Sequence, residues 1–359
     1  MGVDDRLPVA LFSTCPQFDE TAGSYRAAVA EVAQWSERAG CQGILVYADH
    51  RQLDPWLVAQ TVLESTRALS PLVAVQPVYM HPYSVAKMVS SLAHLHGRRV
   101  HLNLISGGFK KDLEALDDPT PHDARYARLI EYAAIVQKLL AGGPPLTFQG
   151  EFYRVSTLRL TPALPPELRP DFYVSGSSAA GLDAARKLGA VAIKYPGAET
   201  LQEWSVDAGA PRSERRGIRV GVIARDTEEE AWRVAHARFP VDRAGQLTHA
   251  LAMKVSDSVW HRQLSQQAGQ ADRASESMPW LVPFQNYKTM CPYLVGSRER
   301  VGAELARYVA AGVETVILDI PPSAEDLLET RAAVLGAPWS PPPIDTAAIE
   351  AARALGVCL

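Results

Sequence analysis

Polar residues occur at the end of a short apolar run in the first third of the chain, and side chains of these types could surround one bound ligand. The run 100–105 contains Asn103 and leads into Ser106 and two glycines. The next expected helix carries His122 and Tyr126 four residues apart, which places both side chains on one face. A polar strand end, a glycine turn and a helix start together favour a cofactor site. The alternative is a structural turn followed by an exposed histidine and a core tyrosine.

A second polar turn carries groups that could bind phosphate. Ser177 and Ser178 follow the apolar run 171–174 and precede a helix expected over 179–188. Backbone N–H groups and hydroxyls at the start of a helix face its positive end, where a phosphate is stabilised. The alternative is that a serine only caps the helix.

Apolar runs alternate with helical spacing along most of the chain, and these elements would position the polar turns. Strands are expected at 8–13, 43–47, 72–77, 100–104, 171–174, 190–194, 218–224 and 315–319. Helices are expected between most of them, and Thr227 with Glu230 forms a capping box at the start of one. Eight strands alternating with helices predict an α/β fold, specifically a TIM (β/α)8 barrel with insertions.

The chain is expected to form one barrel domain over residues 1–359. The alternation breaks at a hairpin pattern over 146–154 and again over 239–293, a stretch rich in Gln, Ser, His and Trp. Such an insertion is expected to form a lid or wall over the active face of a barrel. The proline-rich tail over 336–359 is expected to be peripheral.

Composition excludes several classes of partner. The net charge is −4, from 36 basic and 40 acidic residues, and this balance argues against nucleic acid. The first residues lack the pattern of a signal peptide, and no apolar run approaches the roughly 20 residues of a membrane span. We therefore expect a cytoplasmic protein without a membrane partner. The cysteines have no metal-binding spacing and are expected as free thiols at Cys15, Cys41, Cys291 and Cys358.

Barrel topology nominates further residues, because working side chains of TIM barrels lie at the C-terminal ends of strands. Polar residues at or near the expected strand ends are Gln17, Asp49, Gln76, Asn103, Ser106, Ser177, Arg219 and Asp319. The alternative for any of them is a bond to loop backbone or a helix cap. Within the insertion, the segment 280–288 combines aromatic rings with one cation and predicts a substrate wall that includes Phe284, Tyr287 and Lys288. A surface loop over a small apolar cluster is the alternative.

Three motifs in order resemble the luciferase-like flavin monooxygenases, specifically the alkanesulfonate monooxygenase branch. They run from Asn103 to Gly107, from His122 to Tyr126 and from Ser175 to Ser178, and the resemblance covers roughly residues 8–334. It implies a bacterial-luciferase-like barrel that uses reduced FMN and O2 and needs no metal. It also implies a separate flavin reductase and a homodimer or higher homo-oligomer.

The resemblance also implies roles for individual residues. Ser177, Ser178, His122 and Tyr126 would hold the FMN phosphate and ribityl chain, and Asn103 would bond the edge of the isoalloxazine ring. Gln76 and Ser106, at neighbouring strand ends, are further candidates for cofactor binding. Arg219 would orient the substrate or stabilise a flavin peroxide, and Asp49 matches an acidic residue that some relatives place near the flavin; these two are the catalytic candidates. Gln17 is assigned to the substrate with the 280–288 wall.

One departure from the branch bears on the substrate. The alkanesulfonate enzymes pair an arginine with a histidine on strand seven, whereas this chain keeps Arg219 but has Gly221 at the other position. Loss of the imidazole is expected to open volume for a bulkier or less anionic substrate. Lys288 could meet a carboxylate, the phosphopantetheine phosphate of a carrier, or nothing.

The resemblance, with this departure, therefore implies an FMNH2-dependent monooxygenase for a small organic substrate other than a simple alkanesulfonate, in specialised biosynthesis. A deazaflavin-dependent dehydrogenase on the same barrel and a flavin-binding protein without catalysis remain alternatives. Tight binding of a nicotinamide by a Rossmann turn is not supported, because no Gly-x-Gly-x-x-Gly pattern follows the first expected strand.

Overall fold

Eight parallel strands close into a barrel in the computed structural model, which describes residues 7–21, 23–107, 110–206, 214–255, 265 and 278–336. The barrel strands are β1 (Ala10–Thr14), β2 (Gly43–Val46), β3 (Ser70–Val75), β4 (His101–Leu104), β7 (Phe172–Ser175), β8 (Val191–Lys194), β9 (Arg215–Arg225) and β11 (Val313–Leu318). Closure follows because β9 pairs with both β8 and β11, and β11 pairs with β1. The predicted TIM barrel is confirmed.

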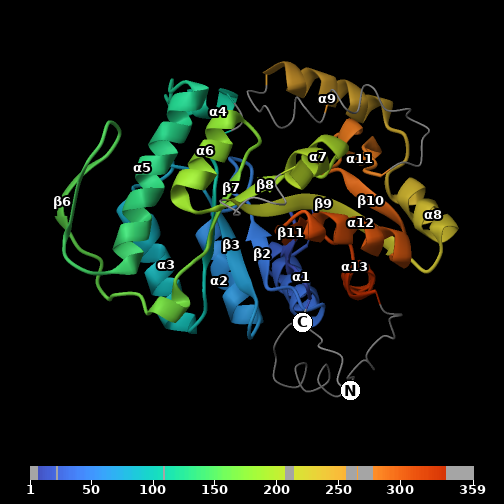
Figure 1. Cartoon of the computed structure of the whole chain (residues 1–359), viewed down its shortest axis with the longest axis horizontal. Helices are drawn as coiled ribbons and strands as arrows, with labels where there is room; N and C mark the ends of the chain where they lie inside the picture. The colour runs from blue at the N-terminus through green and yellow to red at the C-terminus, as the bar shows by residue number, and fades with distance from the viewer. Residues whose placement is uncertain are drawn as a thin grey trace.

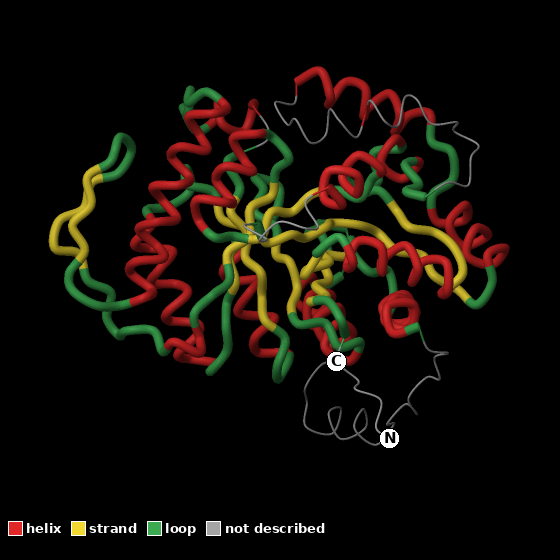
Figure 2. Tube along the Cα trace, in the orientation of Figure 1, coloured by secondary structure: helices red, strands yellow, loops and turns green. Residues whose placement is uncertain are grey.

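Helices surround the strands, which gather at the centre of the molecule (Figure 2). They are α1 (Tyr25–Arg38), α2 (Pro55–Ser65), α3 (Pro82–His96), α4 (Lys110–Ala115), α5 (His122–Ala141), α6 (Ala179–Leu188), α7 (Ala198–Val206), α8 (Glu228–Arg238), α9 (Arg243–Val255), α11 (Val282–Gln285), α12 (Arg298–Ala310) and α13 (Ala324–Leu335). Local sequence sets several starts: the Asp54 side chain accepts from the first turn of α2, and Thr227 accepts from Glu230 N at 3.2 Å. The predicted hairpin forms β5 (Leu146–Gln149) and β6 (Arg154–Leu158), which lie beyond α5 (Figure 1).

Apolar side chains from alternate strand positions fill the barrel and form a floor beneath its C-terminal end. The Phe12 ring meets Tyr173 edge-on with ring centroids 5.6 Å apart. Leu45, in the same cluster, also lines the cavity above. Two larger apolar clusters pack the outer strand faces against the helices. Polar strand-end residues are therefore held over a rigid base.

One strand is missing from the sequence prediction. Residues Tyr293–Ser297 form β10, which pairs in parallel with residues 221–225 of β9. The local signal for a strand is weak here, because the strand has only five residues and ends in Gly296 and Ser297. Strand β9 is also longer than the expected 218–224, and its second half continues beyond the barrel ladder. This extension brings Tyr293 beside the barrel mouth.

The expected insertion at 239–293 contains α9 and α11, and its residues 256–264 and 266–277 lie outside the described part, as does the tail from 337 onward with Cys358. Among the residues described, Cys15, Cys41 and Cys291 are free and buried. None of the helices in the described ranges is long and apolar enough to cross a membrane.

Candidate active site

A cavity of about 760 Å3 opens at the C-terminal ends of the barrel strands. Its size lies within the range typical of cofactor and small-molecule sites. The nominated residues that line it are Gln17, Asp49, Gln76, Asn103, Ser106, His122, Tyr126, Ser177, Ser178, Arg219, Tyr287, Lys288 and Asp319. Residues from both halves of the chain therefore meet around one space, as the barrel topology requires.

Phe284 does not line this cavity. Its side chain is fully buried and meets the His249 ring edge-on, with centroids 4.7 Å apart. It belongs to the apolar cluster that includes Trp280 and Tyr293. The structure therefore places Phe284 behind the predicted substrate wall rather than on its surface.

One end of the cavity is a cradle formed where β7 turns into α6. Ser178 caps α6, since its hydroxyl accepts from Gly181 N at 3.1 Å. The Tyr126 hydroxyl lies so close to Gly176 that a Cβ there would be 2.5 Å from the phenol oxygen. The turn, the helix start and the phenol thus converge, and only glycine permits this approach. This geometry fits a phosphate group at the start of α6.

His122 completes this end of the cavity. Its Nδ1 lies 2.7 Å from an Asp123 carboxylate oxygen, and its ring meets Tyr126 edge-on with centroids 5.3 Å apart. Because a carboxylate only accepts, Nδ1 carries the proton in this contact, and Nε2 remains for a ligand.

A buried ion pair anchors the loop that leads into α5. Asp118 accepts from Arg128 Nη2 at 2.6 Å and Nη1 at 3.1 Å, and from the Thr120 hydroxyl at 2.6 Å. These bonds outweigh the opposing effect of burial and lower the pKa of Asp118 to about 2. The anchor therefore fixes the first turn of α5, which carries His122.

Substituting Asp118→Asn is expected to lower the free energy of unfolding by about 2 kcal/mol at pH 7. A carboxyl group with a depressed folded pKa contributes stability above its unfolded pKa near 4 and loses it as pH falls towards 2. Urea unfolding between pH 7 and pH 3 should therefore show a constant difference from wild type down to about pH 4, and a shrinking one below. The matched control is Asp123→Asn, a mostly exposed carboxylate, expected to change stability by less than about 0.5 kcal/mol. A difference that persists unchanged to the lowest pH would contradict the assignment.

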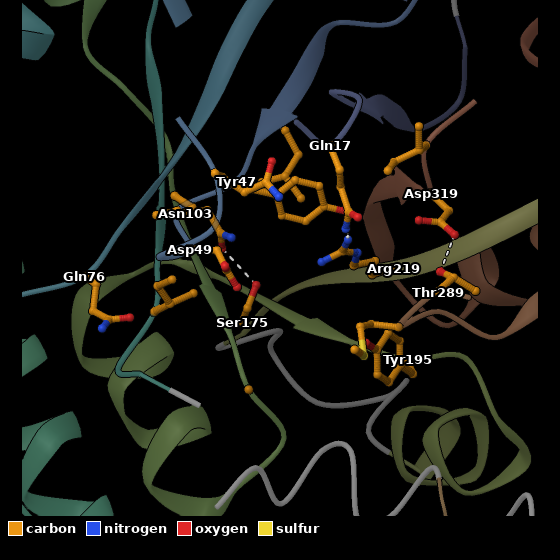
Figure 3. A pocket seen from close by; sticks show the side chains of 18 of the residues that line it. Gln17, Tyr47, Asp49, Gln76, Asn103, Ser175, Tyr195, Arg219, Thr289 and Asp319 are labelled. Atoms are coloured by element: carbon orange, nitrogen blue, oxygen red, sulfur yellow. Dashed lines mark hydrogen bonds between the residues drawn. The ribbon is translucent and has the colours of Figure 1, made fainter. Parts of the chain in front are cut away.

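The middle of the cavity carries amide groups. Ser175 Oγ donates to Asn103 Oδ1 at 2.9 Å, which fixes the orientation of the amide and leaves its NH2 group for a ligand (Figure 3). Gln76 is buried and lines the same space. Asp49 lies at the rim, where one carboxylate oxygen accepts from Arg51 N at 2.9 Å. The amides of Asn103 and Gln76 can bond the polar edge of a planar ring.

At the other end of the cavity, the nominated residues Arg219 and Asp319 are joined by Tyr47, Tyr195, Thr289 and Tyr293, which the sequence analysis did not assign. Arg219 Nη2 donates to the Tyr47 hydroxyl at 2.8 Å, and the guanidinium carbon lies 5.4 Å from the centre of the Tyr47 ring. Asp319 Oδ2 accepts from the hydroxyl of Thr289 (Figure 3). The same oxygen accepts from the Tyr293 hydroxyl at 2.8 Å. This end therefore holds a cation and a carboxylate, each bonded to neutral hydroxyl groups.

The signal for these missed residues differs along the chain. Tyr47 and Tyr195 each follow directly on a barrel strand, so the strand-end rule that nominated Asp49 applies to them equally. Thr289 and Tyr293 belong to the stretch at β10, where no strand was expected. Burial raises the pKa of the Tyr47, Tyr195 and Tyr293 hydroxyls, so all three stay protonated at neutral pH.

The expectation that Gly221 leaves open volume for the substrate is wrong. A Cβ at Gly221 would lie 2.3 Å from two carbons of the Tyr293 ring, so the phenol already occupies this position. Pairing of β10 with β9 puts Tyr293 directly opposite Gly221 in the register, which explains the close approach. The glycine therefore admits an aromatic ring from another strand instead of leaving space.

Lys288 and Tyr287 lie on the cavity wall as expected. Lys288 forms an ion pair with Asp242 at 2.8 Å, so its charge is already balanced. Tyr287 has a φ of 55°, an uncommon backbone conformation for a tyrosine. No group of three or more metal-binding side chains occurs among the residues that the structure describes.

Comparison with known proteins decides the family. The model of a family described as luciferase-like monooxygenase matches residues 9–315. The chain belongs to the luciferase-like monooxygenase family. It is accordingly an oxidoreductase, a monooxygenase that works with reduced flavin.

Individual relatives agree with this assignment. The chain is 34% identical over 301 residues to 4-(gamma-L-glutamylamino)butanoyl-[BtrI acyl-carrier protein] monooxygenase BtrO of Niallia circulans, covering 83% of this chain and 87% of that protein. EDTA monooxygenase EmoA from Chelativorans sp. BNC1 superposes with a TM-score of 0.68 at 16% identity, covering 93% and 99% of the two chains. The oxygenating constituent of 3,6-diketocamphane monooxygenase from Pseudomonas putida, in complex with FMN, gives 0.67 at 17% identity, with 94% and 100% covered. At these identities the two structures support the fold of this luciferase-like monooxygenase.

Proposed function

We propose that this luciferase-like monooxygenase uses reduced FMN, delivered by a separate reductase, to oxidise a carrier-tethered organic substrate with O2. The observation that carries the proposal is one cavity that joins the cradle at the start of α6 to a charged, aromatic end. Ser177, Ser178, His122 and Tyr126 would hold the FMN phosphate. Asn103 and Gln76 would bond the ring edge, with Ser106 beside them.

FMN supplies the reaction of oxygen with substrate when it is bound in reduced form. The protein residues bind and orient both partners and exclude water. Ser175 holds the Asn103 amide in one orientation, and Tyr126 packs against the glycine of the cradle. Arg219 and Tyr47 would hold the substrate at the far end, where burial strengthens their hydrogen bonds.

A carrier-tethered substrate is favoured over a simple alkanesulfonate for two reasons. BtrO, the relative at 34% identity, is named for an acyl-carrier-protein substrate. A sulfonate site would also need several cationic groups, yet Lys288 is balanced by Asp242 and Tyr293 lies beside Gly221. The cavity opens at its rim near Arg51, whose Nε lies 3.4 Å from Asp49 and whose exposed guanidinium could also meet the phosphate of a carrier arm.

Anaerobic titration with reduced FMN and, separately, with a reduced deazaflavin tests the proposal. We expect saturable binding of reduced FMN and slower reoxidation of the bound form than of free flavin after mixing with oxygen. Preference for the deazaflavin would favour a dehydrogenase. FMN binding followed by unprotected reoxidation, with no carrier-tethered substrate oxidised, would favour a passive flavin-binding protein.

A further inference from the structure

The end of the cavity opposite the cradle, here called the inner end, holds a cation and an anion that form no direct ion pair within the described ranges of the chain, although Asp319 is one of the nearby groups that act electrostatically on Arg219. Arg219 bonds the neutral Tyr47 hydroxyl, and Asp319 bonds the neutral hydroxyls of Thr289 and Tyr293. Both charged side chains line the same cavity (Figure 3). Because a charge removed from water is costly unless it is compensated, this end favours a ligand that carries both signs.

The hydrogen-bond roles around Arg219 make one side of this end a donor surface. Tyr47 oxygen accepts from Arg219, so the phenolic proton of Tyr47 is left for another acceptor. Arg219 Nε is buried and has no hydrogen-bond partner among the described residues. A guanidinium and a phenol O–H directed at one space suit a carboxylate.

The roles around Asp319 are the reverse. Tyr293 and Thr289 donate their protons to Asp319 Oδ2, so their oxygens can only accept further bonds. The Thr289 oxygen already accepts from Cys291 N at 3.1 Å, which leaves the Tyr293 oxygen and Asp319 Oδ1. Two acceptors, one of them charged, suit an ammonium group.

Other charged residues nearby do not cancel this arrangement. Arg238 also lines the cavity, but its contacts at 2.9 and 3.0 Å are with the carboxylate of Asp326, which also accepts from Arg225 at 3.0 Å. Lys288 is paired with Asp242. The separation into a donor side and an acceptor side therefore belongs to Arg219 with Tyr47 and Asp319 with Tyr293.

We propose that this end of the cavity binds a free α-amino acid group of the substrate, with the carboxylate on Arg219 and Tyr47 and the ammonium on Asp319 and Tyr293. The inference rests on the proposed function in one respect, since the rest of the substrate then extends towards the flavin. A simple alkanesulfonate would satisfy only the donor side and would leave Asp319 uncompensated.

Binding of three probes of similar length tests the inference: L-2-aminooctanoic acid, octanoic acid and heptylamine. Isothermal calorimetry on the wild-type protein should give at least about tenfold tighter binding for the amino acid than for either partial probe. Asp319→Asn should abolish the advantage over octanoic acid, and Arg219→Gln should abolish the advantage over heptylamine. This crossed change in preference cannot arise from misfolding, which weakens all probes alike.

The matched control is Asp112→Asn, a carboxylate that lines the same cavity and lies 3.8 Å from His50 Nδ1, and it should keep the wild-type preference. Equal affinities of the three probes for wild type, or an equal loss for all probes in both variants, would overturn the inference. Calorimetry needs neither oxygen nor turnover. A protein that selects the amino acid but does not bind FMN refutes the proposed function alone, whereas normal flavin chemistry without selection refutes this inference alone.

Discussion

Substituting Gly176→Ala is expected to weaken FMN binding about 10- to 100-fold. The added methyl group would lie 2.5 Å from the Tyr126 oxygen, which is closer than real contacts allow. Tyr126 lies on the buried face of α5, where its neighbours oppose a change of rotamer. The turn that precedes α6 is therefore expected to shift instead. Overpacking of this kind costs about 1 to 3 kcal/mol, which corresponds to the expected loss. Fluorescence titration with FMN measures it.

A second variant distinguishes a clash with Tyr126 from a general loss of folding as the cause of weaker FMN binding. In Tyr126→Phe the clashing oxygen is absent, so adding Gly176→Ala to that variant should cost less than about threefold in FMN affinity. Tyr126→Phe alone should lose less than about tenfold, the value of one hydrogen bond. If the alanine weakened binding equally in both backgrounds, the contact with Tyr126 would not be its cause.

Introducing the imidazole of the alkanesulfonate branch by Gly221→His is expected to destabilise the protein by about 3 kcal/mol or more. Even a Cβ at this position meets the Tyr293 ring at 2.3 Å, and the ring is buried and held by its bond to Asp319. Both strands would have to separate where β9 pairs with β10. Thermal and urea unfolding measure the loss.

The double variant Gly221→His with Tyr293→Ala decides whether the ring is responsible. Removing the phenol vacates the space of the new side chain, so the double variant should be more stable than Gly221→His alone. Tyr293→Ala alone should be destabilised by about 3 to 5 kcal/mol through its cavity. Additive losses, with no rescue in the double variant, would show that the two positions do not compete for one space.

Periodicity and strand-end chemistry predict most of the barrel and the cradle. The eight apolar runs are distinct, and each places its terminal residues on one face, so Asn103, Ser177 and Arg219 could be assigned to a common cavity from the sequence. The prediction of the inner end of the cavity was incomplete for a physical reason. It depends on β10, whose five residues form a strand only because β9 extends beyond the barrel and offers a free edge. Long-range pairing of this kind leaves little trace in local sequence.

Phe284 shows a related limit. An aromatic residue in a short segment is equally suited to a wall surface or to the cluster behind it, and only the direction of α11 decides between them. The position of Tyr293 could not be read from the sequence either, since its partner Gly221 lies 72 residues away.

The long strand β9 belongs to two structures at once, because its first half completes the barrel and its second half carries β10. Residues of the cradle come from the stretch between 103 and 178, whereas Arg219, Thr289, Tyr293 and Asp319 come from the stretch that begins with β9. Tyr47, the partner of Arg219, comes from the N-terminal stretch instead, so an exchange of the chain from β9 onward would replace Arg219, Thr289, Tyr293 and Asp319 together and leave Tyr47 and the cradle unchanged. Under the proposed function, most residues of the substrate end would therefore change as one block, while the cradle would stay the same.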